Sequence, residues 1–397
     1  MKAHDQCAFF VLDQIEKYNK YFYNGHVLAI NITEGKLTGQ LFTLESGKKD
    51  NTGPQNLTSV YMDTGFEGEI KESWPSEDYT DFVFLNSDSP AKDPKSMETG
   101  TLIGMKRRFE EKLHSDAERI GKIFEEIGID FIDDLNEEVF AVFPSDHSCQ
   151  CKVSFADLKT AYDRCLRDNA ETFLEECLKM MRDHEIDRHD KEKFRLLLSE
   201  DAENFYLLRK QILDTFCIGP HDRRIWHDKS GTAQIKGRHI IETGAVSRHI
   251  IAPESTGMTL LLENGEDGSL QAFRKGERLI PDEVYMLTES GSQPDNGDPE
   301  AGSTFSDRRV GEAIPVYFER SGNYDRPVIK YGENERSIAA EMESFLPSGK
   351  EQGIFLVGFS IDEENDIYLH LWAYDLIEQK ASDTERKYGL IPGVEYG

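Results

Sequence analysis

Several features that are common in proteins are scarce or missing in this sequence. No run of eighteen apolar residues occurs in the 397-residue chain, which excludes a membrane-spanning helix of ordinary length. Only six cysteines are present, mostly within apolar helical patterns, so we expect buried reduced thiols rather than a disulfide framework. Residues 1–5 lack the basic and apolar stretches of a signal peptide, and we therefore expect a cytoplasmic protein without membrane contact.

Motifs that fix a reaction are also missing. The chain has no G-x-G-x-x-G dinucleotide fingerprint, no P-loop pattern and no G-x-S-x-G nucleophile turn. Cys149 and Cys151 form a single C-x-C pair, which falls short of the paired C-x-x-C units that structural zinc usually requires. We therefore predict no metal site, and the sequence leaves open whether a cofactor is bound. A Ser-His-Asp triad stays open, because its members come together in space rather than along the chain.

Basic residues are outnumbered in this chain. The 46 Lys and Arg stand against 75 Asp and Glu, which gives a formal net charge of -29. Such a field repels nucleic-acid duplexes and anionic membrane surfaces overall. Three interpretations stay open: solubility or adaptation to salt, docking onto a basic partner, and mimicry of nucleic-acid charge. The hydrophobic content of 38%, with 23 Phe and 15 Tyr, supplies material for packed cores and excludes wholesale disorder.

Hydrophobic periodicity predicts an α+β fold. Apolar residues recur at helical spacing near the N-terminus and through the middle of the chain, and they alternate at period two elsewhere. Ser154 is placed to cap a helix that begins at the next residue. The expected helical segments cover 11–22, 105–127, 155–165, 173–181, 194–198 and 208–216, and the expected strands cover 28–32, 37–44, 59–62, 82–85, 139–143, 259–262, 284–287, 315–318, 328–331, 354–361 and 367–374.

The order of these patterns predicts three regions in a chain that is too long for one ordinary core. Residues 1–100 form a helix plus antiparallel β-sheet region and end in a linker rich in Ser, Pro, Lys and Asp. Residues 101–220 form a bundle-like helical domain, and residues 221–397 form an antiparallel β-rich domain. An alternative fits equally well: the helical region is inserted between two halves of one sheet domain, so that 1–100 and 221–397 share a sheet.

One segment departs from the acidic composition of the rest. Residues 205–252 contain eight Lys and Arg against four Asp and Glu, together with four of the eleven histidines. Guanidinium groups suit phosphate or carboxylate ligands, and imidazole can shuttle protons. The predicted anion-binding residues are Arg223, Arg224, Lys229, Arg238, His239, Arg248 and His249, and the candidate catalytic residues are His221, Asp222, His227 and Asp228.

Two function hypotheses follow from these observations. The first is an acidic intracellular interaction or regulatory protein that docks a basic protein partner through its negative surface. The second is a nuclease-like or phosphoesterase-like hydrolase that uses residues 221–249, the one segment where we expect a nucleic-acid or phosphate ligand. A structural interpretation competes with the second, because basic side chains in so acidic a protein often pair with carboxylates of their own chain. Convergence of the arginines on one concavity would favour the hydrolase.

Overall fold

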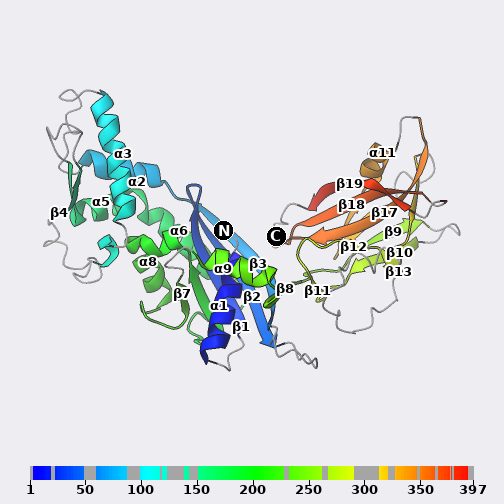
Figure 1. Ribbon diagram of the computed structural model, residues 1–397, viewed down its shortest axis with the longest axis horizontal. Helices are drawn as coiled ribbons and strands as arrows, with labels where there is room; N and C mark the ends of the chain where they lie inside the picture. The colour runs from blue at the N-terminus through cyan, green and yellow to red at the C-terminus, as the bar shows by residue number, and fades with distance from the viewer. Residues whose placement is uncertain are drawn as a thin grey trace. The chain divides into compact units, whose positions relative to one another are not determined.

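The computed structural model describes residues 3–18, 23–48, 60–86, 99–116, 119–122, 138–142, 151–227, 232–261, 267–289, 313–320, 327–346, 349–362, 365–375, 377 and 380–391. The chain divides into two compact units (Figure 1). The N-terminal unit comprises Met1–Val60 and Glu67–Val246, and the C-terminal unit comprises Tyr61–Phe66 and Ser247–Gly397. Helices and antiparallel or mixed sheets together confirm the predicted α+β class. The predicted three-region division, with boundaries at residues 100 and 220, stays a prediction.

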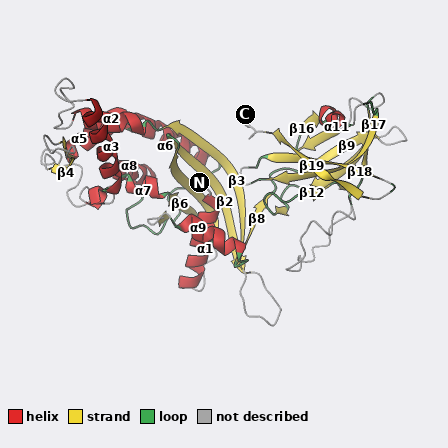
Figure 2. Ribbon diagram, turned by 45° about the horizontal axis from the view of Figure 1, so that its top comes forward, coloured by secondary structure: helices red, strands yellow, loops and turns green. Residues whose placement is uncertain are grey.

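The N-terminal unit combines helices with strands (Figure 2). Its elements are α1 (Ala3–Tyr18), β1 (Asn24–Thr33), β2 (Lys36–Lys48), β3 (Val60–Ser73), α2 (Ser76–Asn86), α3 (Thr99–Ser115), β4 (Glu138–Val142), β5 (Cys151–Ser154), α5 (Phe155–Cys165), α6 (Arg167–Asp183), β6 (Phe194–Leu198), α7 (Glu200–Asn204), α8 (Tyr206–Phe216), β7 (Ile225–His227) and α9 (Ala233–Glu242). Strand β3 carries the chain through Tyr61–Phe66 of the C-terminal unit, where β8 (Val246–Ile251) and β11 (Arg278–Leu279) belong to the same sheet.

The sheet containing these strands has the order β11-β8-β3-β2-β1-β6-β7. Its strand β1 pairs antiparallel with β2 and parallel with β6, which in turn pairs parallel with β7. The β1–β2 hairpin was predicted from alternation and a turn at 33–36, and the structure confirms it. Glu34 and Gly35 form the turn with φ of 50° and 72°, the left-handed conformation that a tight hairpin requires and that glycine adopts without strain.

Helices cover both faces of this sheet. Ile30 pairs with Gly39, and a Cβ at Gly39 would lie 2.9 Å from the ring of Phe173, so α6 packs on that face. Phe42 belongs to the opposite set of alternating side chains, and its ring lies 4.4 Å from that of His4 in α1. Figure 1 shows α1 beside α9 at the sheet. Strand β1 is therefore buried from both sides, in keeping with its almost continuous apolar sequence.

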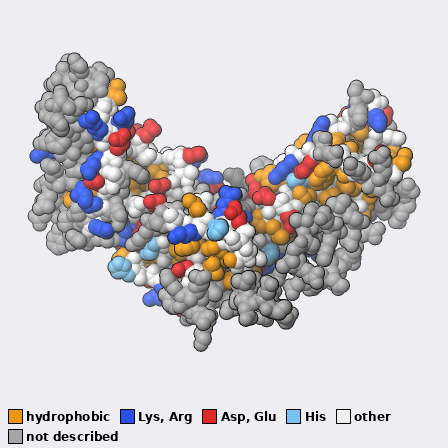
Figure 3. All heavy atoms as spheres, viewed as in Figure 1, with side chains coloured by type: hydrophobic (Ala, Val, Ile, Leu, Met, Phe, Trp, Pro, Cys, Tyr) orange, Lys and Arg blue, Asp and Glu red, His pale blue; other side chains and the backbone are white. Residues whose placement is uncertain are grey.

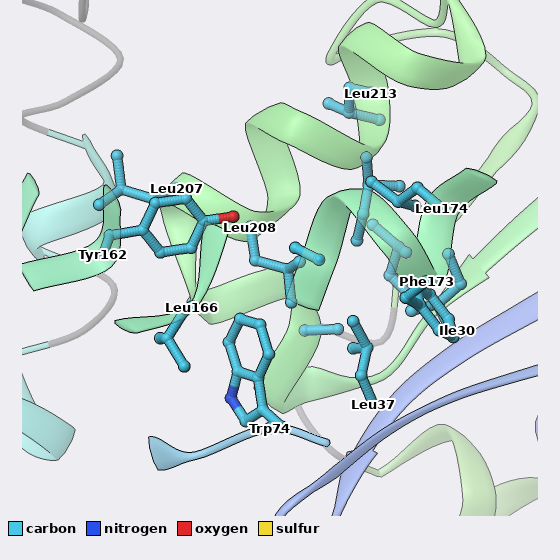
Figure 4. Close-up of a cluster of buried hydrophobic side chains, with 14 of the residues drawn as sticks. Ile30, Leu37, Trp74, Tyr162, Leu166, Phe173, Leu174, Leu207, Leu208 and Leu213 are labelled. Atoms are coloured by element: carbon cyan, nitrogen blue, oxygen red, sulfur yellow. The ribbon is translucent and has the colours of Figure 1, made fainter. Parts of the chain in front are cut away.

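The largest core of the N-terminal unit lies between this sheet and helices α5, α6 and α8 (Figure 4). Trp74, Phe173 and Leu208 are among its fully buried side chains. Helix α5 begins where the sequence predicted, because Ser154 and Asp157 form a capping box in which each side chain accepts a hydrogen bond from the other's backbone N–H. This core fixes the positions of the helices that line the groove described below.

The C-terminal unit is almost entirely β-structure (Figure 2). Two five-stranded sheets, β13-β10-β9-β15-β16 and β12-β17-β18-β19 with β14 on β17, contribute to one core. The predicted 354–374 hairpin is confirmed as β17 and β18. The remaining elements are β9 (Thr256–Leu261), β10 (Asp267–Phe273), β12 (Tyr285–Met286), β13 (Thr288–Glu289), β14 (Val316–Glu319), β15 (Val328–Tyr331), β16 (Asn334–Ser337), α11 (Ala339–Phe345), β17 (Gln352–Ile361), β18 (Ile367–Asp375) and β19 (Lys380–Ile391).

Two expected elements were wrong. Residues 82–85 were expected to form a strand but lie in α2, whose first turn carries Glu77 and Asp78, the acidic residues that a helix N-terminus favours. Residues 194–198 were expected to continue a helix but form β6, which pairs parallel with β1 inside the sheet. Among the described residues, no helix is both long and apolar enough to cross a membrane.

Candidate functional site

Four arginines of the basic segment, Arg209, Arg223, Arg224 and Arg238, have an acidic partner nearby. Arg223 is exposed and forms an ion pair with Glu192. Arg238 lies on the exposed side of α9, where its Nε is 2.9 Å from Glu242 Oε1 one turn along the helix. These two arginines therefore belong to separate, locally neutralised surface pairs. His239 follows Arg238 on α9 and is also exposed.

Arg224 is buried, and each nitrogen of its guanidinium donates a hydrogen bond within the chain. Its side chain is 4% exposed. The guanidinium binds both carboxylate oxygens of Asp222, at 3.1 Å and 2.9 Å, and donates further hydrogen bonds to the carbonyls of Arg188 and Cys217. These bonds hold the pKa of the Asp222 carboxyl below its usual value, chiefly through the hydrogen bond from Arg224. The arrangement fixes the loop that enters β7.

Among the candidate catalytic residues that the structure describes, His221, Asp222 and His227 have separate surroundings. His221 is exposed in the turn before β7, and Asp222 is engaged by Arg224. His227 ends β7, so it lies at the other end of that strand from Asp222. Asp228 and the predicted anion-binding Lys229 lie outside the described residues.

The last two predicted anion-binding residues, Arg248 and His249, lie on β8 in the C-terminal unit. His249 Nδ1 is 3.5 Å from Asp63 Oδ1, and Arg278 Nε is 2.9 Å from the other oxygen of the same carboxylate. Asp63 is 1% exposed, so its charge is buried and matched by these two basic groups. A bound anion at His249 would have to compete with this carboxylate.

His227 does have a partner that the sequence did not indicate. Strands β1, β6 and β7 are parallel, and α7 follows the carboxyl end of β6. Glu203 of α7 is 4% exposed, with its Oε2 3.0 Å from His227 Nδ1 and its Oε1 3.5 Å from Arg209 of α8. Ligands of open α/β sheets bind beyond the carboxyl ends of parallel strands. A histidine oriented by a buried carboxylate can act there as a general base.

Helices α5, α6 and α8 enclose an open groove of about 780 Å³, a volume within the range of ligand-binding clefts. Its floor is apolar and is formed by Tyr162 of α5, Leu174 of α6 and Leu207 of α8. Figure 4 shows these three side chains among those of the buried core. Tyr162 donates a hydrogen bond of 2.6 Å from its hydroxyl to Gln211 Oε1, and burial raises the pKa of this phenol. Leu178, one turn beyond Leu174, is partly exposed.

The basic side chains that line the groove are already paired. Lys159 forms an ion pair with Asp163, and Arg167 lies 3.5 Å from the same carboxylate. Lys210 Nζ is 2.8 Å from Asp214 Oδ2. Lys159 and Asp163 belong to α5 and Lys210 and Asp214 to α8, whereas Arg167 at the start of α6 reaches back to Asp163 of α5. Each lining cation therefore contacts a carboxylate four residues away along the chain, and Lys159 and Arg167 share one.

Two carboxylates of the groove lining have no basic partner among the described residues. Glu171 and Glu175 lie one turn apart on α6 and are both exposed. Within the part of the chain that the structure describes, neither forms an ion pair. The groove therefore combines an apolar floor with two exposed carboxylates that have no ion pair among the described residues.

A second polar cluster, which we did not predict from the sequence, consists of Ser360 on β17, His370 on β18 and Glu385 on β19. His370 Nε2 is 2.7 Å from Ser360 Oγ, and His370 Nδ1 contacts the carboxylate of Glu385. This is the connectivity of a Ser-His-carboxylate triad. Ser360 is 0% and His370 3% exposed, so the serine hydroxyl is closed to a substrate. Burial lowers the pKa of His370 and outweighs the opposing effect of its hydrogen bond with Glu385. The cluster ties three strands together.

The signal for this cluster was present in the predicted hairpin. In the observed register His370 lies opposite Gly358, two residues from Ser360 on the adjacent strand and on the same face. A polar pair at such positions on a buried hairpin indicates a cross-strand hydrogen bond. Glu203 left no comparable signal, because its burial depends on how α7 packs against the sheet.

Comparison with known proteins gives no family: no protein-family model matches the chain, and no curated protein is similar to it at a significant level. Among the described residues, no group of three or more His, Cys, Asp or Glu side chains is arranged to hold a metal ion. The candidate sites are therefore the groove and the His227–Glu203 pair.

Proposed function

We propose that the protein is a non-catalytic interaction or regulatory protein that docks a basic partner through its negative surface. The observation that carries this proposal is how the charges are paired. Arg223, Arg224 and Arg238 are each matched by a carboxylate of their own chain, whereas Glu171 and Glu175 are exposed without one. On the face drawn in Figure 3, basic and acidic side chains are interspersed, in keeping with local pairing.

The net charge of -29 supports the same proposal. A negative field speeds the encounter with a basic partner and discriminates against acidic ones, and both effects weaken as salt screens the charges. The complex is therefore expected to form quickly at low ionic strength and to weaken steeply as salt is added.

The test uses the whole chain and fluorescent poly-L-lysine as the basic probe, with poly-L-glutamate as the acidic control. Anisotropy titrations between about 0.05 M and about 0.5 M salt should show binding to poly-L-lysine that weakens steeply, and none to poly-L-glutamate. Arg223→Ala should leave this binding unchanged, because Arg223 is not a contact for a basic partner. Absence of a complex with poly-L-lysine at the lowest salt would overturn the proposal.

We also propose that this role is cytoplasmic. The four cysteines whose side chains the structure describes, Cys7, Cys165, Cys177 and Cys217, are free thiols. Burial, reinforced by Asp5, raises the pKa of Cys7 to about 12, which keeps it in the unreactive protonated form. Free thiols of this kind suit a reducing compartment. Acid quenching of intact cells, alkylation of the denatured chain and mass spectrometry should find all four reduced, and a disulfide among them would count against this location.

A second candidate function is hydrolysis of a phosphate ester, favoured by the His227–Glu203 pair. In this alternative, Glu203 holds the imidazole and His227 activates a water molecule. Incubation with a general phosphodiester such as bis(4-nitrophenyl) phosphate tests it. Activity that His227→Ala abolishes, and that Arg238→Ala leaves intact, would support the hydrolase, and no turnover above the His227→Ala background would eliminate it.

A further inference from the structure

The groove enclosed by α5, α6 and α8 combines apolar residues with carboxylates that are unpaired within the described chain, and this combination favours one kind of partner. Leu178 is the partly exposed apolar residue of the lining and would be shielded from water by an apolar side chain, whereas Tyr162, Leu174 and Leu207 are already buried beside it. The carboxylates of Glu171 and Glu175 would be neutralised by cations. An anionic ligand meets Glu171 and Glu175 with like charge and finds each lining cation engaged, since Lys159 and Arg167 contact Asp163 and Lys210 contacts Asp214. Charge complementarity therefore points to a cationic occupant with an apolar side.

The spacing of residues along α6 indicates that the occupant is a helix. Residues four apart form a ridge on a helix surface. Glu171 and Glu175 form one such ridge, and Leu174 and Leu178 form the neighbouring one. A third helix that packs against two others places its own ridges between theirs. The two ridges thus offer an apolar row for the buried side of a helix and an acidic row for its flank.

Resting on the function proposed above, we propose that this groove is the docking site for an amphipathic, Lys- and Arg-containing helix of the basic partner. Apolar residues at positions i, i+3 or i+4 and i+7 of that helix lie over the apolar floor, where Leu178 is the partly exposed contact. Basic residues along the adjoining flank pair with Glu171 and Glu175. An extended basic chain reaches the carboxylates but lacks the continuous apolar side that the floor requires.

Two synthetic peptides of identical composition test the conformational part. One arranges Leu and Lys with helical periodicity, and the other contains the same residues in an order that destroys the apolar side. Both are titrated against the whole chain at low salt by fluorescence anisotropy, with poly-L-lysine as the reference. The periodic peptide should bind at least about tenfold more tightly than the reordered one, because only it buries apolar surface on the floor.

Matched variants of the chain test the location. Glu171→Gln with Glu175→Gln removes the acidic row, and Asp183→Asn with Glu185→Gln removes the same charge from exposed positions near the end of α6 that do not line the groove. The first variant should weaken the periodic peptide about fivefold to tenfold, from the loss of two exposed ion pairs. The second should change binding by less than about twofold. Circular dichroism verifies that both variants fold.

A charge swap gives a test that loss of folding cannot imitate. Glu171→Lys with Glu175→Lys should abolish binding of the Lys peptide and create binding of the same periodic peptide with Glu in place of Lys.

Each outcome bears on one proposal. Equal binding of the periodic and reordered peptides, or equal loss in the groove and control variants, would overturn the helix-docking proposal while leaving binding of a basic partner intact. Failure of both peptides and of poly-L-lysine would overturn the proposed function itself. Tight periodic binding that only the groove variants weaken and the charge swap inverts would establish the site.

Discussion

Substitution of Gly237 by Ala is expected to force α1 and α9 apart. Gly237 lies on α9 where that helix crosses α1, and a Cβ at this position would lie 1.6 Å from the carbonyl oxygen of Asp5. Carbon and carbonyl oxygen approach no closer than about 3.3 Å without strain. The helices would therefore have to separate by about 1.7 Å at the crossing. The obstacle is backbone, so no side-chain rotation can relieve it.

Two opposing effects set the size of the change. Alanine stabilises a helix interior by about 1 kcal/mol relative to glycine. Overpacking costs about 1–3 kcal/mol and sometimes more, and a clash with backbone belongs at the upper end. Separation of the helices also loosens the stacking of Phe10 of α1 on Trp226, whose rings are 5.4 Å apart. We expect a net loss of about 2 kcal/mol in the free energy of unfolding of the N-terminal unit.

Denaturant unfolding measures this loss. With Trp372 replaced by Phe, tryptophan fluorescence comes from Trp74 and Trp226, which both lie in the N-terminal unit. The control is Gly104→Ala, at an exposed position of α3 where an added Cβ meets nothing within 4 Å. This control should stabilise by about 0.5–1 kcal/mol. A Gly237→Ala variant as stable as the parent, or shifted in the same direction as the control, would refute the close helix crossing.

Three further predictions follow from single sites. Ser154→Ala removes the capping box of α5 and should lower the free energy of unfolding by about 1 kcal/mol, measured by the same denaturant titration. Arg224→Ala breaks a buried ion pair and should destabilise the N-terminal unit by about 3 kcal/mol, whereas the exposed Arg223→Ala should change stability by less than about 1 kcal/mol. The pKa of His370 is lowered in the folded chain, so the unfolded chain binds the proton first. The C-terminal unit should therefore lose stability as pH falls below the ordinary histidine value of 6.5, and His370→Asn should remove that loss in thermal unfolding across pH.

Features that depend on neighbouring residues were predictable from the sequence. The hairpin that turns at Glu34 and Gly35 was found because alternation and the turn residues lie within one short segment. The helix after Ser154 was found for the same reason, since a capping box spans only four residues. The 354–374 hairpin was found because its alternation is long and regular.

Features that depend on distant segments were not predictable in this way. Phe194 to Leu198 is a short apolar run that suits a buried strand and a buried helix equally, and only its pairing with β1 decides between them. Residues 82–85 pose the same ambiguity, which α2 resolves by burying Val83 and Phe84. Periodicity over so few residues cannot distinguish the two structures.

The candidate site was predicted least well, because a charge's role depends on its partners. The sequence placed Arg223, Arg224 and Arg238 in one basic segment, and the structure assigns each a different carboxylate on a different element. The pairing of Arg238 with Glu242 could have been read from their spacing of four residues. The pairing of Arg223 with Glu192 spans 31 residues and required the fold.

The affinity of an arginine for a ligand is reduced by the free energy of the contacts that the arginine must break to bind it. Arg224 would have to leave the partly buried carboxylate of Asp222 and two carbonyl groups, which costs about 3 kcal/mol by comparison with pairs that are fully buried. Arg223 would give up only an exposed pair worth at most about 1 kcal/mol, but a single exposed guanidinium holds an anion weakly. Glu171 and Glu175 have no ion pair to give up within the described chain. A cation that reaches them gains the full interaction, so the charges most available for binding at this surface are negative ones.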